Sequence, residues 1–317
     1  MSSPHFFLFF LLRDMFIYWS LDNRGMKHNV KTTSILLGLF FVAQIIGLFV
    51  IQNYIDVDAA REGELVFKEL PFDLERPPIE QSTSFLYIIA AILVGTCLVL
   101  LLIKFNKTTL WKVWYGLAVV ICLTISLAAF VPAISAIAVS VVVAFYKVRR
   151  NNPIIHNLTE LFIYGGLAAI FVPVINVVSA IFLLLAISVY DYIAVNKVKH
   201  MVTMAKFQTK AKVFAGLMVG GVKPGKKLKK LPAPQAGRVA ILGGGDIGFT
   251  LLFSGVIFKG LILSSPGTAF LKTLLIPVFA TLFLGALLFL GKKGKFYPAM
   301  PAITAGCLLG YFATLAF

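Results

Sequence analysis

Two aspartates in the second half of the chain, Asp191 and Asp246, lie within long apolar stretches. The only other carboxylate between residues 81 and 317 is Glu160. An ionised side chain near the middle of a membrane-spanning helix costs roughly 2.5 to 3.5 kcal/mol on insertion scales, so such a residue usually serves a function. We therefore look for function first at Asp191 and Asp246.

A pair of neighbouring buried carboxyl groups has a defined chemistry. Two such groups cannot easily both ionise in a low-dielectric environment, so they are expected to share one proton. The ionised member can take a proton from a water molecule that attacks a peptide carbonyl, while the protonated member donates to the developing oxyanion and then to the leaving nitrogen. The sequence leaves open which aspartate is ionised at rest.

The spacing of basic residues places the two aspartates at a similar depth. Asp191 lies six residues before Lys197, and Asp246 lies eight residues after Arg238. At the rise of an α-helix these separations are roughly 9 and 12 Å. Two antiparallel neighbouring helices would therefore hold the carboxyl groups at nearly the same level.

The composition indicates an integral membrane protein with only helical spans. Hydrophobic residues make up 59% of the chain, charged residues 13%, and the mean hydropathy is +0.93. A single soluble core of ordinary proportions could not bury so much apolar surface. We expect nine transmembrane helices, divided at Pro132 where two apolar runs meet. They are Thr33–Ile51, Ser84–Ile103, Val113–Phe130, Val131–Tyr146, Leu158–Val172, Pro173–Ala194, Ala240–Phe258, Leu271–Leu290 and Pro301–Phe317.

The net charge of +16 follows the membrane topology and does not indicate nucleic-acid binding. Of the 29 basic residues, 24 lie before the first span or on alternate loops, as the positive-inside rule requires. The opposite side receives Arg61, Lys68, Arg76, Lys259 and Lys272, and its loop from 52 to 83 carries eight acids. Nine spans then place the N-terminus inside and the C-terminus outside. The lipid bilayer is an expected partner of all the spans.

The expected organisation has four parts. Residues 1–25 form an N-terminal extension, and residues 26–195 form a six-helix part that carries Asp191. Residues 196–238 form a basic loop, with eleven Lys and Arg and no acid, whose tract from Lys223 to Pro234 should be flexible. Before this tract, the mildly amphipathic residues 201–218 either continue the sixth helix or lie on the lipid headgroups. Residues 239–317 form a three-helix part that carries Asp246.

Small and aromatic residues surround the two aspartates. Gly243, Gly244 and Gly245 precede Asp246, although each glycine costs a helix about 1 kcal/mol relative to alanine, so we expect a close approach there by a substrate or by the sixth span. Tyr190 and Tyr192 flank Asp191 and either line the site or belong to an interfacial girdle. Glu160 follows Asn157 by three positions, a spacing typical of a capping box, and is expected to be structural.

The last span begins with prolines, at Pro298 and Pro301, which remove backbone donors and interrupt the helix. This places irregular backbone near the aspartates, where a substrate in extended form could pair with it. No cofactor is expected, and no metal, because the four histidines and three cysteines show no ligand spacing.

Three sequence motifs, in order, resemble those of the presenilin and signal peptide peptidase family of intramembrane aspartyl proteases. They are Tyr190-Asp191, Gly243-Gly244-Gly245-Asp246 as Gly-x-Gly-Asp, and Pro298-Ala299-Met300 followed by Pro301. The resemblance covers about residues 27–317 and implies a presenilin-like bundle with Asp191 and Asp246 as the catalytic pair. It also implies that the segment Pro298–Pro301 shapes the site.

The resemblance sets further expectations about partners. Met300 stands where the third motif usually has leucine, and a flexible apolar residue of similar size should be tolerated. The chain is similar to the compact archaeal homologues, which implies a prokaryotic cell membrane. The expected partners are transmembrane peptide or protein substrates. No partner subunit is evident, and homo-oligomerisation is left open.

Two other functions share some of these features. A prepilin peptidase also has Gly-x-Gly-Asp, but would not supply the Pro-Ala-Met-Pro opening of a last span. An ion or proton pathway also uses intramembrane acids. Against it, no third acid or histidine continues a relay across the membrane, and no inverted repeat is visible.

Overall fold

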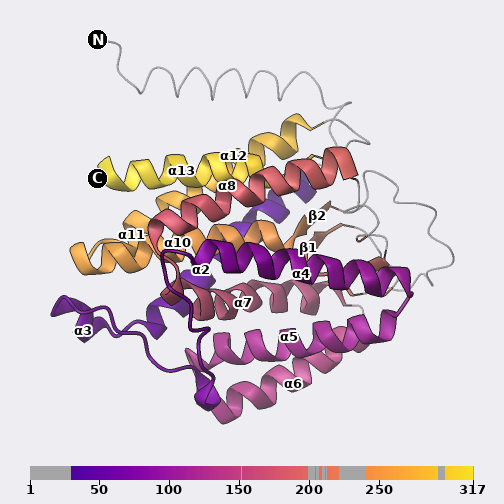
Figure 1. The fold of residues 1–317 in the computed structure, drawn as a ribbon, viewed down its shortest axis with the longest axis horizontal. Coiled ribbons are helices and arrows are strands. Elements are labelled where there is room, and N and C mark those ends of the chain that lie inside the picture. The colour runs from indigo at the N-terminus through magenta and orange to yellow at the C-terminus, as the bar shows by residue number, and fades with distance from the viewer. Residues whose placement is uncertain are drawn as a thin grey trace.

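A computed structural model describes residues 30–150, 152–198, 204, 207, 208, 211, 213–220, 240–291 and 297–316. Long helices run side by side along the longest axis of the molecule (Figure 1). The long helices are α2 (Val30–Tyr54), α4 (Ser84–Lys104), α5 (Thr108–Ala128), α6 (Ala133–Arg149), α7 (Pro153–Phe171), α8 (Val177–Ile193), α10 (Gly244–Ser264), α12 (Leu275–Leu290) and α13 (Met300–Ala316). Shorter elements are α3 (Val57–Arg61), η1 (Pro71–Asp73), η2 (Val172–Val174), η3 (Ala194–Val198), α11 (Ala269–Thr273) and the strands β1 (Gly216–Val219) and β2 (Ala240–Gly243).

Each of the nine predicted spans contains a helix, and the predicted break at Pro132 falls between α5 and α6. In the described part of the chain, seven helical segments are long and apolar enough to cross a membrane. The other two, α6 and α13, have 17 residues each. The prediction of a helical membrane protein is therefore confirmed, whereas nine crossings and the orientation of the termini remain predictions.

Helix α10 occupies the centre of the bundle. In its most apolar window 72% of the residues are buried, compared with 11% in α4. The sequence of α10 is apolar on all sides, which is typical of a helix enclosed by others. Its Phe253 and Phe258 are buried in the main apolar core, to which α2, α7, α8, α12 and α13 also contribute. The helix that carries Asp246 is thus the most enclosed, and its position is fixed by neighbours on every side.

A short antiparallel sheet corrects the expectation of an all-helical chain. Strand β1 pairs with β2, with Gly216 opposite Gly243 and Val219 opposite Ala240. Residues 240–243, predicted as the start of the seventh span, are extended, and α10 begins only at Gly244. The predicted helical continuation through residue 218 was wrong at its end, where β1 lies. The tract Lys223–Pro234 and the extension 1–25 lie outside the described residues.

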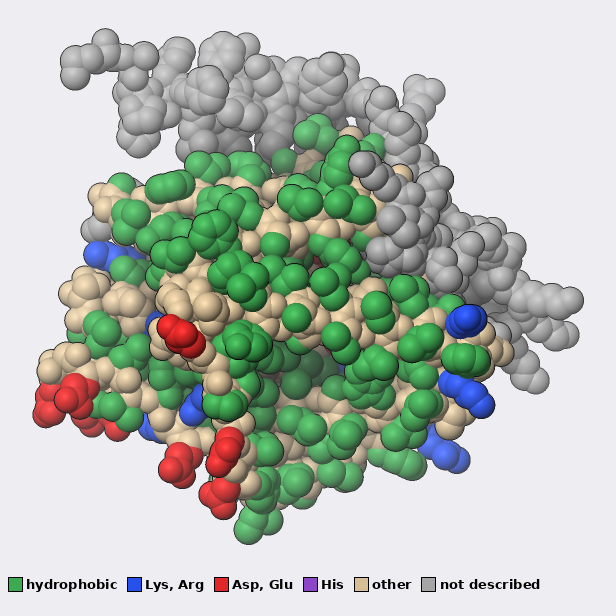
Figure 2. Space-filling model, in the orientation of Figure 1, with side chains coloured by type: hydrophobic (Ala, Val, Ile, Leu, Met, Phe, Trp, Pro, Cys, Tyr) green, Lys and Arg blue, Asp and Glu red, His purple; other side chains and the backbone are tan. Residues whose placement is uncertain are grey.

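Charged side chains gather at the ends of the bundle. Acidic residues lie at one end, where α3 and the loop after it are found, together with some basic residues, whereas the end where α4 joins α5 shows basic residues without acidic ones (Figure 2). Two lysines expected in loops are instead buried in helices, Lys147 in α6 and Lys259 in α10. Lys147 is described below with the residue that it pairs with, and Lys259 lies near the C-terminal end of α10. Its Nζ donates to the carbonyls of Val172, Pro173 and Ile175 at 2.9, 3.3 and 2.5 Å. These carbonyls end α7, where a cation also complements the helix dipole.

Helices α12 and α13 pack with their backbones in close contact. A Cβ atom on Gly306 would lie 2.7 Å from the Phe279 carbonyl oxygen, and one on Gly310 would lie 2.6 Å from Ile276 Cα. Glycines four residues apart permit such an approach between membrane helices. No larger residue fits at either position without separating the two helices, so α12 and α13 form one tightly joined hairpin.

Candidate active site

Asp191 lies in the last turn of α8 and meets the beginning of α13. Its residue is 6% exposed, and its Oδ2 accepts a hydrogen bond from the Met300 backbone N–H at 3.1 Å. The Ala299 backbone also hydrogen-bonds this carboxylate. The first N–H groups of a helix have no partner within it, and a helix N-terminus favours a negative charge. Asp191 therefore occupies the N-terminal end of α13, beside two residues of the Pro298–Pro301 segment.

Asp246 lies in the first turn of α10, three residues after the N-cap Gly243. Its carboxylate hydrogen-bonds the Gly243 backbone, which is half of the capping-box arrangement. Its Oδ2 would lie only 3.3 Å from a Cβ atom on Gly243, so a side chain there would crowd the carboxylate. The N-terminal position again favours the ionised form.

The structure places the two aspartates on packed helices, α8 and α10, close enough for their charges to interact. Among the described residues, the ion pairs join Arg61 to Asp58 and Lys147 to Glu160, and neither involves Asp191 or Asp246. Asp191 is buried and Asp246 is partly buried. Two neighbouring carboxylates away from water and without a cation cannot both remain charged at low cost, which is the condition for sharing a proton.

Two hydrogen bonds fix α8 beside its neighbours near Asp191. Ser188 Oγ lies 2.7 Å from Thr304 Oγ1 of α13, and Tyr190 OH lies 3.3 Å from Thr96 Oγ1 of α4. Tyr192, in contrast, is 53% exposed and points away from the core. Of the two flanking tyrosines, Tyr190 is therefore the one joined to a neighbouring helix.

The glycine run meets α7 rather than α8. A Cβ atom on Gly244 would lie 2.6 Å from the Tyr164 hydroxyl oxygen, while one on Gly245 would have no contact closer than 3.6 Å, to Phe249. The close approach expected at these glycines is thus present at Gly244, but with the fifth predicted span. Tyr164 was not singled out from the sequence, because an isolated tyrosine in an apolar run carries no pattern.

Glu160 corrects another expectation. Helix α7 begins at Pro153 with Asn152 as its N-cap, whose side chain accepts from the Ile154 N–H, so the predicted capping box from Asn157 to Glu160 was wrong. Glu160 is instead 1% exposed and forms an ion pair with Lys147 at 2.5 Å. It is a second buried acidic centre, joined to a cation.

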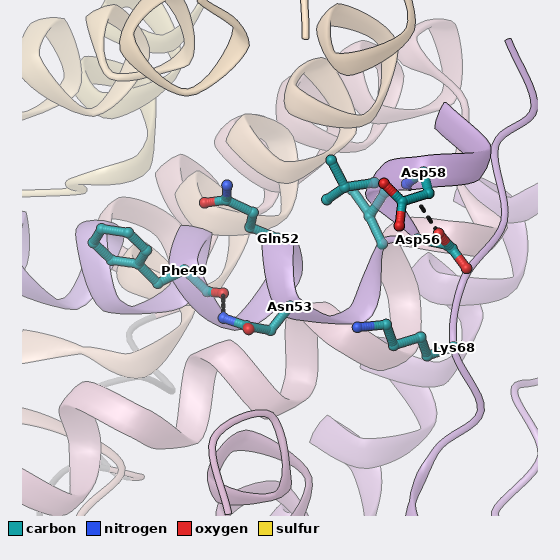
Figure 3. Close-up of a pocket in the computed structure, with 8 residues that line it drawn as sticks. Phe49, Gln52, Asn53, Asp56, Asp58 and Lys68 are labelled. Carbon is teal, nitrogen blue, oxygen red and sulfur yellow. Dashed lines mark hydrogen bonds between the residues drawn. The ribbon is translucent and has the colours of Figure 1, made fainter. Parts of the chain in front are cut away.

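A pocket of about 530 Å³ lies at the acidic end of the bundle, and neither Asp191 nor Asp246 lines it (Figure 3). Phe49, Gln52 and Asn53 of α2 face Asp56, Asp58 and Lys68 across it. Asp56 is already used there, because its Oδ1 caps α3 by accepting from the Asp58 and Ala59 N–H groups. No group of three or more potential metal ligands occurs among the residues described.

Comparisons with known proteins agree with this arrangement. The model of the family described as "Signal-peptide peptidase, presenilin aspartyl protease" matches residues 46–317. A solved structure of a presenilin family intramembrane aspartate protease in space group C222 has a TM-score of 0.60 and 18% identity, covering 90% of this chain and 98% of the other. A P2 crystal form of such a protease gives a TM-score of 0.57 and 19% identity, covering 89% and 96%. No curated protein matches.

The fold and the site therefore define an integral membrane protein of the aspartyl protease class. The chain belongs to the signal-peptide peptidase and presenilin family, and it is an intramembrane aspartic endopeptidase that acts on membrane-spanning substrates.

Proposed function

We propose that Asp191 and Asp246 are the catalytic pair of this protease. The observation that carries the proposal is that the buried Asp191 and the partly buried Asp246, on the packed helices α8 and α10, are close enough for their charges to interact and, in the described part of the chain, form no ion pair with a cation. Asp246 lies in the first turn of α10, and Asp191, in the last turn of α8, accepts a hydrogen bond from the first residue of α13, so each carboxyl group is beside a helix start whose backbone N–H groups can stabilise one negative charge. The pair is thus suited to hold one charge and one proton.

The proposed reaction hydrolyses a peptide bond with one water molecule. The ionised carboxylate removes a proton from water as the oxygen attacks the peptide carbonyl carbon, and the protonated carboxyl donates to the carbonyl oxygen. In the collapse of this tetrahedral intermediate one hydroxyl returns its proton to the carboxylate that had donated it, and this carboxyl passes the proton to the leaving nitrogen as the carbon–nitrogen bond breaks. Products are a carboxylic acid and an amine, and the pair returns to one shared proton.

The residues around the pair are proposed to shape the site. Met300 and Ala299 hold Asp191 through their backbone, while Pro298 and Pro301 supply the irregular start of α13 that exposes those N–H groups. Gly243, Gly244 and Gly245 keep space beside Asp246, and Tyr190 joins α8 to α4. Because prolines leave neighbouring backbone groups unpaired, an extended substrate could hydrogen-bond there.

The proposed topology has nine crossings with the N-terminus inside and the C-terminus outside. It is supported by the end of the bundle where α4 joins α5, which shows basic residues without acidic ones, since basic residues favour the cytoplasmic side. The four-part division at residues 25, 195 and 238 belongs to this proposal. We further propose a prokaryotic, archaeal cell membrane, substrates with a single membrane span, and no obligatory partner subunit.

The test is the cleavage of a single-span substrate by purified protein with Asp191→Asn or Asp246→Asn. Each variant is expected to lose cleavage down to background while remaining folded, because asparagine keeps the shape of the side chain but cannot exchange the proton. Retained cleavage in either variant would remove that residue from the pair. Circular dichroism and gel filtration of each variant serve as controls for folding.

The pH dependence supplies a second test of the shared proton. At low pH both carboxyls are protonated and no base remains, whereas at high pH both are ionised and no acid remains. The rate should therefore be bell-shaped in pH. A rate that stays flat from acid to alkaline pH would contradict a two-carboxyl mechanism.

A further inference from the structure

The buried carboxylate of Glu160 accepts hydrogen bonds from four groups on four different elements. Its Oε1 accepts from Lys147 Nζ of α6 at 2.5 Å and from the Tyr115 hydroxyl of α5 at 2.8 Å. Its Oε2 accepts from the Tyr164 hydroxyl of α7 and from the Gly216 N–H of β1 at 3.1 Å. One oxygen therefore faces the outer helices, and the other faces the strand that pairs with β2.

Side chains of α7 occupy the outer edge of β1 as a third strand would. Asn157 accepts from the Met218 N–H at 3.0 Å and donates to the Met218 carbonyl at 2.7 Å. His156 Nε2 lies 2.8 Å from the Gly216 carbonyl, which can only accept, so this nitrogen donates. With Glu160 on the Gly216 N–H, both outward-facing residues of β1 have their backbone groups paired. The first two turns of α7 thus fix the position of β1.

The start of α10 is held by the same assembly. Strand β2 pairs with β1 and ends at Gly243, the N-cap of α10, and the Gly244 N–H donates to the Ala215 carbonyl at 3.1 Å. On the other side of Gly244 lies the Tyr164 hydroxyl, which Glu160 holds in place. Asp246 is two residues further along this turn and interacts electrostatically with Tyr164. The position of Asp246 therefore depends on both groups bound to Glu160 Oε2.

We propose that the ion pair of Glu160 and Lys147 is a positioning device for Asp246, acting through β1 and Tyr164. This inference rests on the proposed role of Asp246 as one of the catalytic pair. Glu160 is a positioning residue, because it contacts the elements around Asp246 and not the reacting atoms. The carboxylate has two oxygens and so can hold Tyr164 and Gly216 together, while Lys147 keeps the charge on that carboxylate.

Stability alone is a weak explanation for this pair. A buried ion pair can often be replaced by apolar residues of similar volume without loss of stability, because both charges must be removed from water when it forms. A geometric role, in contrast, requires an acceptor at this place in the core. The two explanations predict different kinetics for the same variants.

The test compares Lys147→Met and Glu160→Gln with the double variant, and uses Lys259→Met as the matched control. Lys147 and Lys259 are both buried lysines, each 6% exposed, but Lys259 binds the carbonyls at the far end of α7. For each variant, kcat and KM for a single-span substrate are measured on the monodisperse folded fraction, together with the thermal midpoint. Tyr164→Phe is measured as well, because it keeps the ring and removes only the hydroxyl.

The expected result is a fall in kcat of tenfold or more for Lys147→Met and Glu160→Gln, with KM changed less than twofold. The double variant should regain most of this kcat, since a neutral glutamine can turn its amide nitrogen toward the Tyr115 oxygen and keep its oxygen toward Tyr164 and Gly216. Lys259→Met should lower the thermal midpoint while kcat stays within twofold of the original protein. Tyr164→Phe should also lower kcat. If Lys147→Met does not fold, the kcat of Tyr164→Phe is used to decide whether the inference holds.

The inference is overturned if Lys147→Met and Tyr164→Phe keep the original kcat, whatever happens to their thermal midpoints. It is also overturned if Lys259→Met lowers kcat as much as Lys147→Met does. Asp246→Asn, measured in the same assay, separates this inference from the proposed function. If Asp246→Asn still cleaves the substrate, the proposed assignment of the catalytic pair is wrong. If it does not cleave, the Lys147 and Tyr164 variants test the positioning role alone.

Discussion

The two buried acidic centres of this bundle are built in opposite ways. Glu160 receives four hydrogen bonds, one of them from a lysine, and its acceptor capacity is largely used. Asp191 and Asp246 receive backbone hydrogen bonds and their charges interact, with no ion pair to any described residue. A carboxylate saturated with donors is held in one ionisation state, whereas a pair that repels can exchange a proton. The comparison distinguishes a structural carboxylate from the proposed reactive pair, of which Asp191 is buried and Asp246 partly buried.

The largest effect expected from this difference is on stability. Glu160→Ala should lower the free energy of unfolding by about 3 to 5 kcal/mol, because it leaves the Lys147 ammonium buried without its partner. Asp246→Ala should change it by no more than about 1 kcal/mol, since a lost backbone hydrogen bond is offset by relief of repulsion from Asp191. Thermal unfolding in detergent measures both. Equal losses in the two variants would contradict the comparison.

An intermediate effect is expected at Gly244, which lies between the two centres. Gly244→Ala should lower activity about tenfold and stability by about 1 to 3 kcal/mol, because the added methyl meets the Tyr164 hydroxyl at 2.6 Å. Gly248→Ala is the matched control, because its Cβ would lie 3.5 Å from the same ring, an ordinary contact. Substrate cleavage and thermal unfolding are compared for both variants. Combining Gly244→Ala with Tyr164→Phe should reduce the loss of stability; a purely additive result would show that the hydroxyl is not the obstacle.

The smallest effect is expected at the hydrogen bond between α8 and α13 that Ser188, three residues before Asp191, makes with Thr304. Ser188→Ala should lower the free energy of unfolding by about 0.5 to 1.5 kcal/mol, as should Thr304→Val, because each removes the same 2.7 Å hydrogen bond. The double variant should cost less than the sum of the single ones. A thermodynamic cycle measures this coupling, and strictly additive losses would indicate that the two hydroxyls act independently.

Much of the fold could be predicted because its signals are local. Apolar runs identify the helices, and prolines and basic residues mark their ends, so all nine helical segments were found in the right places. Counting residues to the nearest basic markers predicted that Asp191 and Asp246 lie at a similar depth, and the two helices that carry them pack together. The family model supports the class of protein, while the catalytic roles of the two aspartates remain predictions until they are tested.

The sequence was less informative where buried polar side chains form hydrogen bonds with residues far away along the chain. Lys259 was placed in a loop because a lysine near the end of an apolar run usually reaches water, and its three carbonyl partners belong to another helix turn. The capping box at Glu160 was wrong although a better signal was present, namely Asn152 followed by Pro153. The partners of Glu160 are spread from residue 115 to residue 216, so no short pattern could reveal them. The strands β1 and β2 have four residues each, and the outer edge of β1 is paired by side chains of α7.

The glycine contacts between α12 and α13 have a consequence for how the site could open. Because Gly306 and Gly310 bring the two backbones together, α13 cannot slide or tilt alone without losing its close contacts with α12. The Met300 N–H that holds Asp191 is carried on the first turn of α13. Any motion that moves this N–H away from Asp191 must therefore move α12 and α13 together as one rigid body. A displacement of α12 would in this way be transmitted to Asp191.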